Sequence, residues 1–139
     1  MALFHKFNQF SEDVAQGVHK LKPSADALQL ALTNTQPSPA DEVLSDLTEI
    51  SYTNLSSRAV TITGSGQALG VFTLICADVV LTASGVVAGF RYVVLYNTTP
   101  TTPLKPLIGW WDQGSVVSMT NGQVFTISFD NTLGVLQLE

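Results

Sequence analysis

The sequence predicts a mainly β protein, an antiparallel β-sandwich or jelly-roll-like barrel, with one N-terminal amphipathic helix and a possible second short helix. Short runs rich in Val, Ile, Thr and aromatic residues recur after Tyr52, and turn residues separate most of them. No helical pattern interrupts these runs. The length of 139 residues is typical of one domain. We therefore expect a single domain over 1–139, with a helix over 1–22 and a mainly β core over 26–139.

Apolar residues near the start recur every three or four positions and line one face of the predicted helix. They are Leu3, Phe7, Phe10, Val14, Val18 and Leu21, and Phe4 widens the face. Pro23 closes the segment. The apolar face either packs on the domain's own sheet, which we favour, or presents Phe4, Phe7 and Phe10 to a neighbouring subunit.

A strand and a short helix are expected after Pro23. Alternating leucines predict a strand over 27–33 with one apolar face. That face consists of Leu28, Leu30 and Leu32. Ser38 is a suitable N-cap and Pro39 suits the first helical position, so the second helix would begin there and reach Ile50.

The remaining strands are predicted from β-branched and aromatic runs between turn signals. They cover 59–63, 71–78, 79–82, 91–97, 107–112, 115–119, 124–130 and 135–138. We expect turns at 64–66 and at Gln113-Gly114. Asn121-Gly122 between two strand-like runs predicts a β-hairpin.

The share of charged residues is low and the net charge is negative, which limits the classes of partner that the chain can bind. Only 12% of residues are charged, the net charge is −5, and the six basic residues are scattered. We expect no nucleic-acid partner, because no basic stripe is available to neutralise phosphates. The apolar region 71–96 is interrupted by Asp78 and Arg91, so no membrane span is expected. The first residues do not form a secretory signal, which indicates a chain made in the cytoplasm.

Metal and cysteine chemistry are not expected, and no cofactor is predicted. Cys76 lies in an apolar run, which favours a buried and inert thiol. His5 and His19 would lie about 20 Å apart on a straight helix, too far to share an ion. Both are expected on the polar flank of that helix.

Carboxylates offer an alternative, because a pair of them could serve a glycoside hydrolase. The acids within or ending strands are Asp78, Asp112 and Asp130. The simpler interpretation is structural: Asp112 and Asp130 cap the backbone at strand-to-turn junctions, and Asp78 can pair with Arg91 if their strands are neighbours. We therefore expect no catalytic residues and no enzyme.

Two adjacent tryptophans are the strongest candidates for a contact surface. Alternation along a strand sends Trp110 and Trp111 to opposite faces, so one is core and the other is exposed or buried in an interface. The candidate interface residues are Phe4, Phe7, Phe10, Trp110 and Trp111.

Several segments together resemble a family of small structural proteins encoded in the morphogenesis modules of tailed phages and prophages. The segments are 4–10 (FHKFNQF), 30–35 (LALTNT), 43–50 (VLSDLTEI), 77–85 (ADVVLTASG), 90–97 (FRYVVLYN), 106–112 (PLIGWWD) and 125–130 (FTISFD). The resemblance covers nearly the whole chain and is weakest in the first helix. Relatives often carry a glycine-rich stretch where this chain has 51–57 (SYTNLSS).

The resemblance implies a non-enzymatic virion protein, made in the host bacterial cytoplasm and located in the particle. The leading hypothesis is a head decoration (cement) protein that contacts itself and the major capsid protein or another virion protein; a trimer is one fitting homo-oligomer. The alternatives are a tail or head–tail connector component, or a module whose loops 51–57 and 97–105 bind a host surface or glycan.

Overall fold

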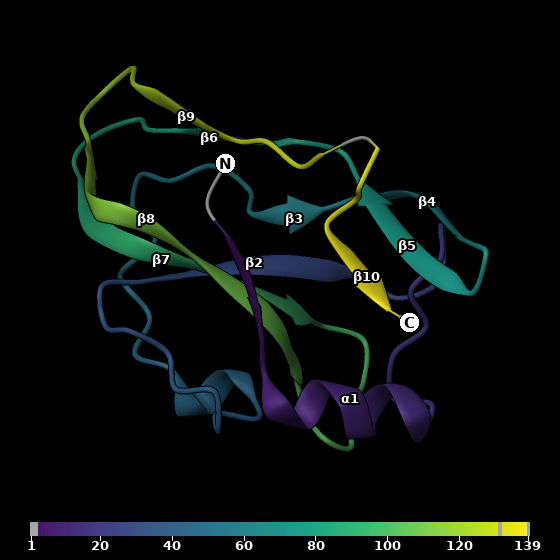
Figure 1. The fold of residues 1–139 in the computed structure, drawn as a ribbon. Helices are drawn as coiled ribbons and strands as arrows, with labels where there is room; N and C mark the ends of the chain where they lie inside the picture. Colours follow the sequence, from purple (N-terminus) through teal and green to yellow (C-terminus); the bar gives the residue numbers. More distant parts are fainter. Residues whose placement is uncertain (1–2, 131, 139) are drawn as a thin grey trace.

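The prediction of a mainly β chain with antiparallel sheets is confirmed by the computed structural model, which describes residues 3–130 and 132–138. Figure 1 shows a large central sheet, smaller sheets on one side of it, and the helix α1 at its lower end. The described strands form an open, sandwich-like arrangement and do not close into a barrel.

All strand pairs are antiparallel. The central sheet contains, in spatial order, β1 (Phe4–Lys6), β8 (Leu107–Met119), β7 (Val87–Asn97), β2 (Leu28–Thr33) and β3 (Ala59–Val60). A second sheet contains β10 (Leu136–Leu138), β5 (Val71–Cys76) and β4 (Ile62–Ala68). The third pairs β6 (Val79–Thr82) with β9 (Val124–Ile127).

The predicted N-terminal helix over 1–22 is wrong at both ends, and its first two residues lie outside the described part of the chain. Residues 4–6 form β1, because they pair with β8 at the edge of the central sheet. The helix α1 covers only Asn8–Ala15. It ends because Gly17 adopts a left-handed conformation (φ 76°), and the Val18 N–H then donates to the Asp13 carbonyl at 2.9 Å.

The predicted second helix is also wrong, because only a 3-10 turn, η1 (Leu44–Asp46), forms there. The backbone that leads into η1 is held against the segment before β8. Val43 forms an antiparallel bridge with Pro106, and the Leu107 N–H donates to the Glu42 carbonyl at 3.0 Å. These long-range bonds use backbone groups that a longer helix would need for itself.

Two predicted turns and one predicted hairpin differ from what the structure shows. Residues 64–66 lie inside β4, and the chain reverses instead at Leu69 and Gly70, both with positive φ. Gln113-Gly114 is a bulge within the single strand β8, with Gly114 at φ 86°. Asn121-Gly122 does form a turn, but no hairpin results, because β9 pairs with β6 and not with β8.

The central sheet buries residues on both of its faces. The alternation predicted for β2 is confirmed: Leu28, Leu30 and Leu32 are buried in the core beneath the smaller sheets. The opposite face carries a second buried cluster. It contains Phe7, Ala31, Tyr92, Val94, Tyr96, Leu107 and Trp110, with Leu44 and Leu47 packed against it. The coil around η1 lies on this side of the sheet, whereas α1 lies at the lower end of the sheet and packs Phe10 and Val14 into the core beneath the smaller sheets (Figure 1).

Candidate interaction surface

The aromatic residues predicted to form an interface lie largely inside the domain. Phe7 and Phe10 are fully buried, and Trp110 and Trp111 are each only 5% exposed. The two tryptophans do occupy opposite faces of β8, as alternation predicts. The expectation that one of them is exposed is wrong, because the chain covers both faces of the central sheet. Phe4 is half-buried.

The N-terminal segment itself covers the tryptophans. The Phe4 ring lies 5.2 Å from the Trp111 ring, and the Phe7 ring lies 4.7 Å from the Trp110 ring. His5 stacks on Trp110 at 5.0 Å between ring centroids. The favoured prediction, that this segment packs on its own domain, is therefore confirmed for Phe7 and Phe10. The predicted helical conformation holds for Phe10 in α1 but not for residues 4–6, which form β1.

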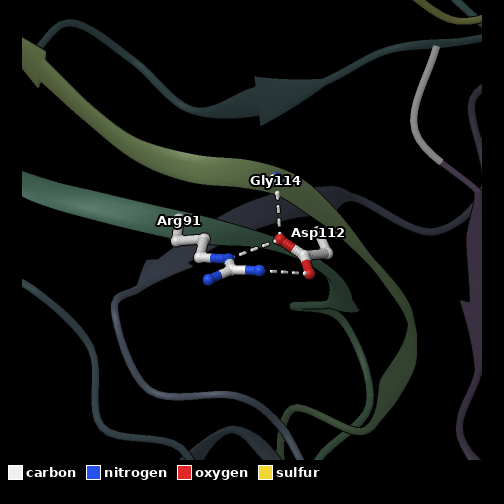
Figure 2. Close-up of polar contacts among 3 residues, drawn as sticks. All are labelled: Arg91, Asp112 and Gly114. Carbon is white, nitrogen blue, oxygen red and sulfur yellow. Dashed lines mark hydrogen bonds and ion pairs between the residues drawn. The ribbon is translucent and has the colours of Figure 1, made fainter.

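The exposed ion pair on the central sheet differs from the predicted one. Arg91 on β7 pairs with Asp112 on β8, and not with Asp78: the Arg91 Nε to Asp112 Oδ1 distance is 2.8 Å and the Nη2 to Oδ2 distance is 3.1 Å (Figure 2). The Gly114 N–H also donates to Asp112 Oδ1, which closes the bulge. The hydrogen bonds from Arg91 are the main reason that the pKa of Asp112 is lowered.

The two other candidate carboxylates also bind backbone. Asp78 accepts the Phe129 N–H at 2.9 Å. Asp130 accepts the N–H groups of Leu133 and Thr132, and these bonds lower the pKa of Asp130. The predicted capping by Asp112 and Asp130 is confirmed. A glycoside hydrolase needs one carboxyl group with a raised pKa as its general acid, and the lowered pKa values of Asp112 and Asp130 do not suit that role.

His19 belongs to a buried polar cluster, which corrects its predicted place on a polar helix flank. It follows α1 and is 8% exposed, with Nδ1 3.0 Å from Asn97 Nδ2. The Thr99 N–H donates to Asn97 Oδ1, and Asn97 Nδ2 donates to Asp26 Oδ2 at 2.6 Å. This orientation makes His19 Nδ1 the acceptor, which leaves its proton on Nε2. Burial is the main cause that lowers the pKa of His19.

The described residues contain no assembled metal site and no reactive thiol. Residues 3–130 and 132–138 contain no group of three or more His, Cys, Asp or Glu side chains that could hold a metal ion. His5 lies on β1, apart from the His19 cluster. Cys76 is buried as predicted, and burial raises the pKa of its thiol to about 12.

The loop 51–57, a candidate recognition loop, is tied to the central sheet. The Leu32 N–H donates to the Tyr52 hydroxyl at 3.0 Å, and that hydroxyl donates to Glu49 at 2.6 Å. The Arg58 guanidinium lies 3.5 Å from the centre of the Tyr52 ring. These contacts fix Tyr52 as an anchor of the loop.

An exposed, uncharged face on the β6–β9 sheet is the candidate that sequence reasoning missed. The register places Val80 opposite Thr126 and Thr82 opposite Val124. All four side chains point outward, with Val80 52% and Val124 57% exposed. We call these four residues the β6–β9 outer face. The alternation of each strand was visible in the sequence, but the pairing that joins them was not.

No protein-family model, curated protein or solved structure matches this chain. In the part of the chain that the structure describes, the helices are too short or too polar to cross a bilayer.

Proposed function

We propose that this chain is a non-enzymatic structural protein of a tailed-phage particle, and that it decorates the head through repeated contacts with itself and the major capsid protein. The observation that supports a role in protein contact is the β6–β9 outer face. It is an exposed strand surface with two valines, two threonines and no charge. The sequence resemblance supplies the phage setting.

The energetics favour a role in a repeated assembly. Apolar surface removed from water contributes about 25 cal/mol per Å², before the entropic costs of association. One small face therefore supports only a weak contact. Repetition over a shell, with each subunit held at several points, converts weak contacts into stable attachment. Because the aromatic residues are buried within the domain itself, the domain can fold before it attaches to the shell.

Counting copies in purified particles tests the proposal. Quantitative mass spectrometry of particles from the host that carries this sequence should find the chain at hundreds of copies, in proportion to the major capsid protein. A count matching a single ring would replace decoration by a tail or head–tail connector role. Absence from particles, with adhesion of the purified protein to host cells, would replace it by surface recognition.

Binding to shells tests the surface directly. Purified chain added to empty heads that lack it should saturate at a fixed ratio to capsid subunits. A Val80→Lys, Val124→Lys double variant should bind at least about tenfold more weakly. Leu69→Lys is the matched control, because Leu69 is a fully exposed apolar residue on the β4–β5 turn, away from the β6–β9 outer face.

A further inference from the structure

The strand β9 has one free edge. Among the described residues it pairs with β6 on one side only. The far edge of β6 is occupied, because the Ser56 N–H donates to the Thr82 carbonyl at 3.1 Å and the Thr82 N–H donates to Ser56 Oγ at 2.8 Å. The two edges of this small sheet are therefore unequal.

The bonds at Thr82 also fix which backbone groups β9 presents. Since the N–H and C=O of Thr82 point toward Ser56, its pair with Val124 is not hydrogen-bonded. The bond from the Ala83 N–H to the Gln123 carbonyl, at 2.9 Å, agrees with this phase. Antiparallel pairs alternate, so the N–H and C=O groups of Val124 and Thr126 point away from β6, along the free edge.

This edge lacks the usual protection against pairing. Natural edge strands carry lysine, proline or a bulge, or are covered by another element. The sequence of β9, Val-Phe-Thr-Ile, has no charge and no proline, and its register with β6 is regular. An open groove of about 240 Å³ runs beside it, lined in part by Trp111, Phe125 and Phe129.

We propose that β9 pairs antiparallel with β9 of a second copy of this chain, about a two-fold axis at Phe125. In this register Val124 bonds to Thr126 of the second copy, in both directions, through the free backbone groups. Phe125 lies opposite Phe125 of the second copy, on the side of the groove, where the aromatic lining can pack against both rings. We assign a second copy to this edge because the edge carries no charge. Two copies can therefore meet there without bringing like charges together, even though each chain has a net charge of −5.

The pairing also completes an element that is weak alone. A two-stranded sheet is only marginally stable, and the two-fold pairing makes it four-stranded, in the order β6-β9-β9-β6. The inference rests on the proposed function for its biological meaning, since it names the self-contact of a decoration protein. Its test needs only the purified chain: a solitary chain overturns the pairing, whereas absence from particles overturns the proposed function.

Amide hydrogen exchange at two protein concentrations tests the edge residue by residue. The amides of Val124 and Thr126 should exchange at least about tenfold more slowly at high than at low concentration, because pairing protects them. The amides of Phe125 and Ile127 already bond to β6 and should change much less. A chain that stays monomeric in sedimentation at millimolar concentration, or a dimer that leaves Val124 and Thr126 unprotected, would overturn the proposal.

Two edge variants and a control complete the test. Thr126→Pro removes an outward N–H that the bond to β6 does not use, so it should abolish the dimer and leave the monomer folded. Val124→Lys should weaken dimerisation at least about tenfold, by the lysine protection that natural edges use. Val80→Lys, on the covered strand of the same outer face, should dimerise like the wild type. Equal dimerisation of all three variants would refute pairing through β9.

Discussion

The replacement Gly109→Ala should release the N-terminal strand from the central sheet. Gly109 on β8 lies opposite Lys6 on β1. A Cβ added at Gly109 would stand 2.7 Å from the His5 carbonyl oxygen and would overlap the Phe4 ring. The ring could turn away, but the carbonyl belongs to the backbone of β1. The strand as a whole therefore has to move.

The expected cost follows from the contacts that β1 loses. A three-residue antiparallel pairing supplies two or three backbone hydrogen bonds, each worth about 1 kcal/mol net. The Phe4–Trp111 ring contact contributes about 1 kcal/mol more. We expect Gly109→Ala to lower the free energy of unfolding by about 3 kcal/mol, from these values together. That corresponds to a fall of roughly 1–2 M in the urea midpoint for a domain of this size.

Urea unfolding followed by tryptophan fluorescence measures this loss. Gly66→Ala is the matched control, because a Cβ at Gly66 in β4 meets nothing within 4 Å and its φ is not left-handed. The control should change stability little, or raise it slightly. An unchanged midpoint for Gly109→Ala, or equal losses in both variants, would show that the pairing of β1 with β8 contributes little.

Three further predictions concern titratable groups. Burial lowers the folded-state pKa of His19 below 6.5, so the unfolded chain binds more protons than the folded chain. The free energy of unfolding should therefore fall as the pH drops from 6.5 toward that lowered pKa. The substitution His19→Gln should remove this part of the dependence of the urea midpoint on pH. The Cys76 thiol, with a pKa of about 12, should react with iodoacetamide at pH 8 about a thousandfold more slowly than in urea. Asp112→Asn should barely move the urea midpoint, because Arg91 and Asp112 are 39% and 36% exposed, and a large drop would show that the pair fixes the bulge.

Local periodicity predicted much of the β structure. The alternation of Leu28, Leu30 and Leu32 identified both a strand and its buried face, because a two-residue period follows from strand geometry alone. The opposite directions of Trp110 and Trp111 were predicted for the same reason. Their exposure was not, since the groups that cover Trp110 include Phe7, about a hundred positions earlier in the chain.

Features set by pairing between distant segments could not be read from the sequence. Residues 3–7 fit a helical period, yet residues 4–6 form the strand β1 because they pair with β8. Gln113-Gly114 has turn composition, but the partner strand β7 runs past it and leaves a bulge. The β6–β9 outer face depends on a pairing between strands about forty residues apart. No local signal specifies that partner.

The position of β1 has a consequence for how the chain reaches its native state. Trp111, the partner of Phe4, is translated more than a hundred residues after it. Until then the segment bearing Phe4, Phe7 and Phe10 has no sheet to join, and its rings stay available to chaperones or to other nascent chains. Such a high sequence separation between partners favours late docking of β1, after β7 and β8 have paired.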